Sequence, residues 1–140
     1  MEIVMDAAAL QGFLTREFPQ VQEDFEIVSI TPDGIQVKLL VTPAHLRPGG
    51  TVSGPSMFAL ADVGMYLAVL SRIGPQALSV TTNCSIDFMR KPAAGDDLIC
   101  DVVLHKLGRS LAVGSALIYS EGGANPVASA SLTYAIPPVR

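Results

Sequence analysis

The sequence is short of charged residues, which make up 16% of its 140 positions, while hydrophobic residues make up 49%. Its nine Lys and Arg residues form no basic cluster interleaved with aromatics, and the formal net charge is −4. Nucleic-acid binding requires basic side chains that neutralise phosphates, so this composition argues against a nucleic-acid partner. The low charge and high apolar content instead favour subunit contacts or an apolar ligand.

Cysteines are also few. Cys84 and Cys100 fall in separate strand-like runs without metal-ligand spacing, so we interpret them as buried, reduced thiols. Clustered metal ligands are absent as well, and we expect no metal or redox cofactor. Near the N-terminus, Glu2 and Asp6 stand where a signal peptide would carry basic residues, which predicts a cytoplasmic protein.

Several catalytic motifs are missing. There is no G-x-S-x-G elbow, and the only histidines are His45, in a loop, and His105, in a strand-like run. We therefore disfavour a serine-hydrolase triad, interpret His105 as structural or exposed, and leave the role of His45 open. Gly49 and Gly50 lack the spacing of a nucleotide-binding loop, which excludes that class of enzyme.

The hydrophobic periodicity predicts a single domain over residues 1–140. A short helix, interpreted as a flanking element, follows Asp6 and ends before Pro19, and residues 25–41 read as a hairpin. Residues 55–73 predict a helix that is apolar on more than one face and is therefore enclosed by protein. Strands are predicted over residues 80–88, 98–107, 110–119 and 127–136, the last three as an antiparallel meander. The fold class is α+β, an antiparallel sheet wrapped around a long central helix.

Two strands have informative faces. In residues 80–88 the alternation places Thr81 on a polar face with Asn83, and Val80 on an apolar face with Cys84. In residues 110–119 one face carries small side chains around Gly114. Such a face allows another element to approach closely.

Asp62 is the most informative residue, because it is the only charged residue in the apolar segment 51–71. Burying an unpaired charge is costly, so the residue must have a partner or a use. A membrane span is disfavoured, since an aspartate at its centre would cost about 2.5 to 3.5 kcal/mol. We predict that Asp62 is catalytic.

The start of the same helix offers a second functional group. Free backbone N–H groups near Ser53 and Gly54 point outward and favour negative charge, so they suit a developing oxyanion. Asp62 lies eight residues beyond Gly54, about 12 Å along a straight helix. An extended substrate, a bent helix entry or a second subunit must therefore bring the two groups to one substrate.

Residues 47–62, RPGGTVSGPSMFALAD, together with residues 81–92 and the Leu107-Gly108-Arg109 turn, resemble hotdog-fold acyl-CoA thioesterases of the phenylacetate-degradation (PaaI-like) type. The resemblance covers about residues 43–134. It implies a helix enclosed by an antiparallel sheet, with strand 81–89 pairing across a homodimer that often doubles into a tetramer. It also implies two active sites at each dimer interface, and no cofactor apart from the coenzyme A of the substrate.

The resemblance also implies roles for individual residues. Asp62 falls on the catalytic carboxylate, which acts as nucleophile or as the base that activates water, and Gly54 falls on the glycine whose N–H polarises the thioester carbonyl. Thr81 falls on a hydroxyl residue contributed by the partner subunit, which orients the water or the carboxylate. Basic positions expected to face the phosphates of coenzyme A are Arg90, Lys91 and Arg109.

This sequence departs from the family pattern at the helix entry. It has Ser53-Gly54-Pro55 where the family commonly has His-Gly-Gly, and Arg47 near the position of an asparagine. Pro55 has no N–H, so the oxyanion site depends on Gly54. Ser53 and Arg47 are counted among the substrate-binding candidates, with Arg47 expected either to pair with an anionic group of the ligand or to act on Asp62 through its charge.

These observations predict a homo-oligomeric thioesterase that hydrolyses an acyl-CoA to the free acid and coenzyme A. The alternative is a non-catalytic acyl-CoA binding or sensing protein on the same fold. A hotdog dehydratase or hydratase would need a histidine where Ser53 stands, and is disfavoured. Residues such as Met65 and Tyr66 line either an acyl pocket or the core, and the acyl group remains open.

Overall fold

The described chain contains two α-helices and six β-strands, in a computed structural model that describes residues 1–138. The last two residues of the expected domain, 139 and 140, lie outside the described residues. The α+β prediction is confirmed, and each helix and strand lies close to its predicted position. The elements are α1 (Ala7–Glu17), β1 (Phe25–Thr31), β2 (Gly34–Leu39), a 3-10 turn η1 (Pro43–His45), α2 (Gly54–Ile73), β3 (Val80–Phe88), β4 (Leu98–Leu107), β5 (Leu111–Ser120) and β6 (Ala128–Ala135).

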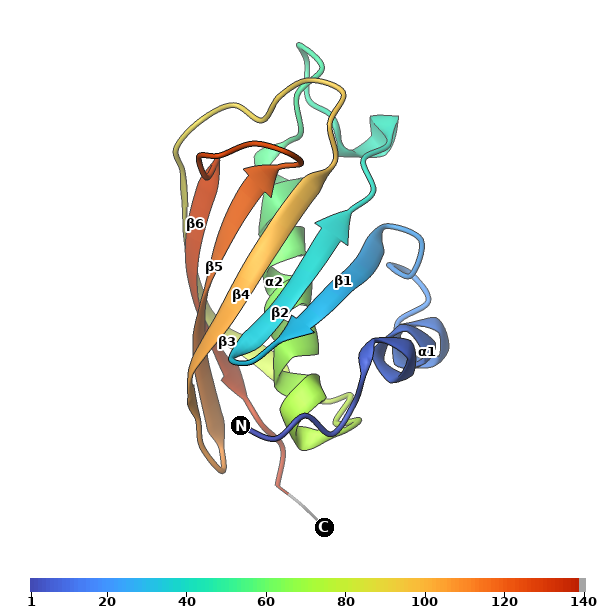
Figure 1. Ribbon diagram of the computed structural model, residues 1–140, viewed down its shortest axis with the longest axis vertical. Helices are drawn as coiled ribbons and strands as arrows, with labels where there is room; N and C mark the ends of the chain where they lie inside the picture. The colour runs from blue at the N-terminus through green and yellow to red at the C-terminus, as the bar shows by residue number, and fades with distance from the viewer. Residues whose placement is uncertain (139–140) are drawn as a thin grey trace.

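The strands form one antiparallel sheet in the order β1-β2-β4-β5-β6-β3. Figure 1 shows this sheet curving around α2, with α1 beside β1. The predicted hairpin and the β4-β5-β6 meander are both present. β3 joins at the end of the sheet, next to β6, so its other edge has no strand neighbour within the described chain.

Local sequence explains both ends of α2. The Ser53 hydroxyl oxygen accepts a hydrogen bond from the Ser56 N–H, Pro55 occupies the first turn, and Gly74 ends the helix at φ 94°, a conformation that favours glycine. The helix is long and apolar enough to cross a membrane, yet 72% of its apolar stretch is buried inside the protein. It is the helix that the sheet encloses, as predicted.

The small face of β5 lies under α2. A Cβ atom on Gly114 would lie 2.7 Å from Met65 Sδ and 2.8 Å from the Val103 carbonyl oxygen, so the helix approaches the sheet as the small residues predicted. Helix α1 flanks the sheet beside β1 (Figure 1), as interpreted from the sequence. Its apolar side belongs to the core, since Phe13 is 1% exposed and both Leu10 and Leu14 are fully buried.

The predicted alternation of β3 was wrong at its start because the strand contains a bulge. Thr81 pairs with Tyr134 and Asn83 pairs with Thr133, which leaves Thr82 as an extra residue between them. Residues paired directly across two strands point to the same side of the sheet. Thr81 therefore shares the inner side with Tyr134, toward α2, and not the outer side with Asn83.

The two cysteines are free thiols, as expected. Cys100 is fully buried in the core, and burial raises the pKa of its thiol. Cys84 on β3 is only half-buried, which corrects the expectation that both are enclosed. The pKa of the Cys84 thiol is also raised, first by burial and then by the negative charge of Asp62.

Candidate active site

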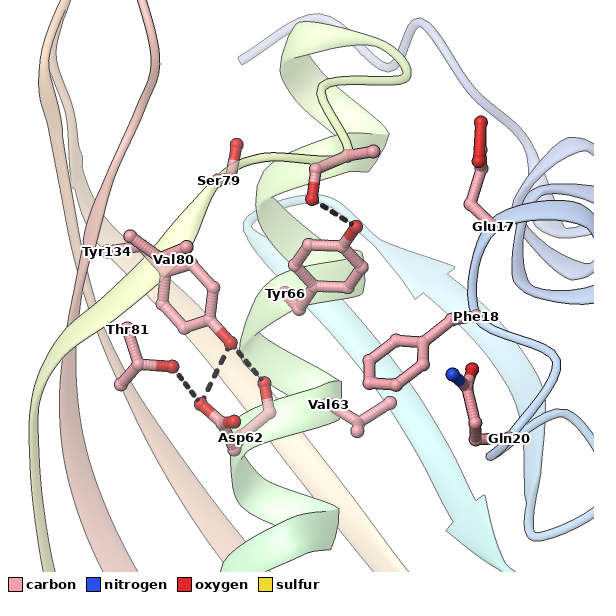
Figure 2. Close-up of a pocket in the computed structure, with 11 residues that line it drawn as sticks. Glu17, Phe18, Gln20, Asp62, Val63, Tyr66, Ser79, Val80, Thr81 and Tyr134 are labelled. Carbon is pink, nitrogen blue, oxygen red and sulfur yellow. Dashed lines mark hydrogen bonds between the residues drawn. The ribbon is translucent and has the colours of Figure 1, made fainter.

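Asp62 lies half-buried in the middle of α2 and opens onto a cavity of about 490 Å³. The cavity lies between α2, the start of β3 and the segment that follows α1, and Figure 2 shows its side chains. Its volume falls within the range of small-molecule sites. The lining residues are Glu17, Phe18, Gln20, Asp62, Val63, Tyr66, Ala77, Ser79, Val80, Thr81 and Tyr134.

Two hydroxyl groups bind the same oxygen of the Asp62 carboxylate. The Thr81 hydroxyl donates to Oδ1 at 2.5 Å, and the Tyr134 hydroxyl donates to Oδ1 at 2.8 Å (Figure 2). The Tyr134 hydroxyl also lies 3.0 Å from the backbone carbonyl oxygen of Asp62. No described residue donates a hydrogen bond to Oδ2, so this oxygen is available to a ligand.

Tyr134 is held in its protonated form. Its side chain is 3% exposed, and its pKa is raised, first by burial and then by the nearby Asp62 charge. A neutral phenol donates a hydrogen bond and leaves the negative charge on the carboxylate. The sequence indicated that the Asp62 charge needs a partner or a use. The structure provides two neutral hydrogen-bond donors, the hydroxyls of Thr81 and Tyr134.

The structure corrects one implied role and adds one residue. The resemblance implied that Thr81 comes from a partner subunit, but its hydroxyl contacts Asp62 of its own chain. The bulge at Thr82 turns it inward. Tyr134 was not identified from the sequence. The alternation of β6 places it on the inner face of the sheet, but its position opposite Thr81 depends on the register between β3 and β6, which the bulge shifts.

A second cavity, of about 390 Å³, lies at the start of α2 and contains four of the predicted site residues. Arg47 lies in the segment before α2, and Gly54 is the first residue of that helix. Arg90 and Lys91 lie in the segment after β3. Three cationic side chains around one cavity, in a protein of net negative charge, suit an anionic group. The other lining residues are Thr51, Val52, Met57, Phe88, Met89 and Pro92.

The Gly54 N–H is the available donor of the first helical turn. The Ser56 N–H binds the Ser53 side chain at 3.3 Å, and the Met57 N–H binds the Ser53 carbonyl at 3.1 Å. Pro55 has no N–H, and no described residue accepts a hydrogen bond from the Gly54 N–H. The Ser53 side chain caps the helix and lines neither of the two cavities.

Within one chain these groups form two separate halves. Gly54 and Asp62 lie on one continuous helix, about 12 Å apart, and line different cavities. Arg109 lies in the turn between β4 and β5, at the other end of the sheet from the start of α2 (Figure 1), and lines neither cavity. The single chain therefore does not bring Gly54 or Arg109 to Asp62.

The histidines have structural roles. His45 Nδ1 accepts a hydrogen bond from the Thr42 N–H at 2.9 Å, and Nε2 lies 3.3 Å from Asp24 Oδ1. Both ring nitrogens are engaged, so His45 cannot act as a base for Ser56, which lines the same small cavity. His105, as predicted, is exposed and contacts Ser115. Among residues 1–138 no group of three or more His, Cys, Asp or Glu residues could hold a metal ion.

Comparison with known proteins identifies the family. A profile described as "Thioesterase superfamily" matches residues 49–127, more than half of the chain. The chain belongs to the thioesterase superfamily. The matched region includes the start of α2, Asp62, β3 and the basic pair Arg90 and Lys91.

Similar proteins agree with this assignment. The crystal structure of a provisionally assigned thioesterase from Silicibacter sp. is 54% identical, with a TM-score of 0.92 over 99% of this chain and 96% of that one. A provisionally assigned esterase of Pseudomonas aeruginosa is 37% identical over 102 residues, 72% of this chain and 74% of that protein. A variant of the phenylacetic acid degradation protein PaaI from Thermus thermophilus is 28% identical, with a TM-score of 0.72 over 85% of this chain and 99% of that one. The resemblance to hotdog thioesterases, including the PaaI type, is confirmed.

Proposed function

We propose that this thioesterase hydrolyses an acyl-CoA to the free acid and coenzyme A, with Asp62 as nucleophile or general base. The proposal depends on one observation: the Asp62 carboxylate is held through Oδ1 by two hydroxyls, while Oδ2 has no partner in the described chain and the residue lines a 490 Å³ cavity. An oriented carboxylate with one free oxygen can take a proton from water or attack a carbonyl carbon.

Either route replaces the C–S bond of the thioester with a C–O bond. In the base route, Oδ2 takes a proton from water, the water oxygen attacks the carbonyl carbon, and the sulfur leaves and is protonated. In the nucleophile route, Oδ2 attacks the carbonyl carbon, coenzyme A leaves as the C–S bond breaks and its sulfur is protonated, and water then hydrolyses the mixed anhydride to the free acid and the Asp62 carboxylate. The Gly54 N–H stabilises the oxyanion in both, and neither route needs a metal or redox cofactor.

A homodimer would join the two halves of the site. Thr81, near the start of β3, contacts Asp62, and Phe88, at the end of β3, lies beside Gly54, where a Cβ atom would be 3.4 Å from its ring. If two β3 edges pair antiparallel across a two-fold axis, the start of one strand meets the end of the other. Asp62 of one subunit would then approach Gly54 of its partner.

The surface of β3 supports this pairing. Its free edge is accompanied by exposed apolar side chains, with Val80 55%, Phe88 50% and Met89 47% exposed. Exposed edge strands invite pairing with another chain, and apolar patches mark interaction surfaces. We propose a homodimer, which can double into a tetramer.

The basic cavity is proposed to bind the phosphates of coenzyme A. Arginine is well suited to phosphate because its planar fork donates two parallel hydrogen bonds, and lysine adds a point charge. Arg47, Arg90 and Lys91 line the same cavity as Gly54, so phosphates there would place the thioester near the oxyanion donor. The free thiols Cys84 and Cys100 suit a reducing compartment, and we propose a cytoplasmic location.

Thiol release from acyl-CoA tests the function. Short, long, aromatic and hydroxylated acyl-CoAs are incubated with the protein, and the released thiol is measured with a chromogenic reagent. We expect Asp62→Asn to keep the fold and lose about 10²- to 10⁴-fold in kcat, while Asp96→Asn, in an exposed turn, serves as the matched control. Equal rates in Asp62→Asn and the unmodified protein would contradict the mechanism.

A second candidate function is acyl-CoA binding without hydrolysis. It is favoured by the helix entry, where Pro55 and the capped Ser56 leave Gly54 as the available first-turn donor. Saturable acyl-CoA binding with no thiol release across the whole panel would support this alternative.

A further inference from the structure

We propose that Tyr134 is a positioning residue of the active site, which together with Thr81 holds Asp62 so that only Oδ2 faces the substrate. This inference rests on the proposed thioesterase mechanism. It assigns a role to a residue beyond the segment 49–127 that matches the superfamily profile. It also identifies which carboxylate oxygen reacts.

The Tyr134 hydroxyl binds the carboxylate and the helix backbone together. It lies 2.8 Å from Asp62 Oδ1 and 3.0 Å from the Asp62 carbonyl oxygen. The charged oxygen is the nearer and the stronger acceptor. The carbonyl belongs to the backbone of α2. A hydroxyl that contacts both oxygens therefore fixes the position of Oδ1 relative to the helix backbone.

The Tyr134 ring is fixed by its surroundings. It is 3% exposed, and its centroid lies 6.1 Å from that of Tyr66. Tyr66 in turn packs edge-on against Phe18 at 6.2 Å and is tied through its hydroxyl to the Ala77 carbonyl at 3.0 Å. Packed aromatic rings prefer such tilted and edge-on arrangements. The phenol is therefore presented to Asp62 from a rigid position.

The two donors come from paired positions of two strands. Thr81 and Tyr134 are directly opposed across β3 and β6, so the sheet maintains the spacing between their hydroxyls. The terminal torsion of an aspartate is broad, and one donor alone leaves the plane of the carboxylate free to rotate. Two donors on Oδ1 select one orientation, and correct orientation of the reacting group contributes strongly to rate.

The substitution Tyr134→Phe tests the proposal, because it removes the hydroxyl and keeps the ring packing. We expect kcat for the best acyl-CoA to fall about tenfold, the effect of losing one hydrogen bond to a charged group, with KM changed less than about twofold. The matched control is Tyr119→Phe on the outer side of β5, where Tyr119 lies outside the Asp62 cavity. The control should retain the kcat of the unmodified protein.

A double variant separates positioning from general stability. If both hydroxyls are needed to select one orientation, either single variant already loses it, so Thr81→Val with Tyr134→Phe should lower kcat by less than the product of the two single effects. An unchanged kcat in Tyr134→Phe would overturn the proposal. This holds even if the variant has a lower melting temperature or a higher KM.

Crystal structures distinguish this outcome from failure of the proposed function. If the unmodified protein hydrolyses none of the acyl-CoAs, the function fails, and the orientation of Asp62 alone then decides the role of Tyr134. We expect one angle of the Asp62 carboxylate plane in the unmodified protein and a rotated or split plane in Tyr134→Phe. A single, unchanged orientation in the variant would overturn the positioning role.

Discussion

Thr81 and Tyr134 are cross-strand partners whose hydroxyls meet at one oxygen of Asp62. This relationship depends on the bulge at Thr82, since regular alternation along β3 would direct Thr81 away from α2. Bulges often redirect a side chain beside an active site. Here the extra residue converts a polar position of an edge strand into a contact with the candidate catalytic carboxylate.

The Thr81 hydroxyl is expected to matter more than its methyl group. Thr81→Ser keeps a donor at the same position and should retain most of kcat, whereas the nearly isosteric Thr81→Val should lose about tenfold. Steady-state thiol release from one acyl-CoA measures both variants. If Thr81→Val and Thr81→Ser behave alike, the hydrogen bond to Asp62 does not contribute to turnover.

Sharing of the site between subunits predicts complementation. Gly54→Pro removes the oxyanion N–H and Asp62→Asn removes the carboxylate, so each variant alone should be nearly inactive. A heterodimer of the two contains one intact site, made of Asp62 from one subunit and Gly54 from the other. Random mixing after unfolding and refolding should restore about a quarter of the normal activity in a two-fold symmetric dimer.

The control for complementation is each variant refolded alone. Native mass spectrometry of the mixture verifies that heterodimers have formed. Recovery of no activity in a sample that contains heterodimers would place both catalytic groups within one subunit, and would contradict the shared site.

The basic cavity predicts a dependence on the phosphates of the substrate. Arg47→Ala and Arg90→Ala should raise KM for acyl-CoA and leave KM for the matching acyl-pantetheine, which lacks the nucleotide, nearly unchanged. The physical reason is that only the CoA substrate carries the charged group that these side chains would bind. Lys106→Ala, on exposed β4 outside the cavity, is the control. A parallel rise of KM for both substrates would indicate a structural effect.

The tight space at Gly114, between Met65 of α2 and Val103 of β4, predicts a loss of stability in Gly114→Ala. The new Cβ atom would meet the Val103 carbonyl oxygen at 2.8 Å, and a backbone atom cannot move aside cheaply. We expect the free energy of unfolding to fall by about 1 to 3 kcal/mol in urea denaturation.

Gly12→Ala is the matched control for Gly114→Ala. Gly12 lies within α1, where the nearest atom to a new Cβ atom is an Arg16 side-chain nitrogen at 3.5 Å. Alanine is the better helix former, so this variant should gain about 0.5 to 1 kcal/mol. Similar effects of both substitutions would show that the space under α2 is not limiting.

The sequence by itself determined most of the fold and half of the site. Apolar periodicity identified α2 as an enclosed helix, the small residues of β5 identified its contact surface, and the lone charge of Asp62 identified the candidate catalytic group. These properties are local, because they depend on which side chains a helix or a strand can place on one face. The grouping of Arg47, Gly54, Arg90 and Lys91 around one cavity also agrees with the residues selected from the sequence.

Only the tertiary structure decided which hydroxyls reach Asp62. The bulge at Thr82 and the register of β3 against β6 arise from pairing between segments about fifty residues apart, and no local pattern specifies such a pairing. The same pairing turned Thr81 inward within its own chain and revealed Tyr134. The structure also shows one continuous helix from Gly54 to Asp62, so no bend in the helix shortens the separation that the 1.5 Å rise per residue predicted from the sequence.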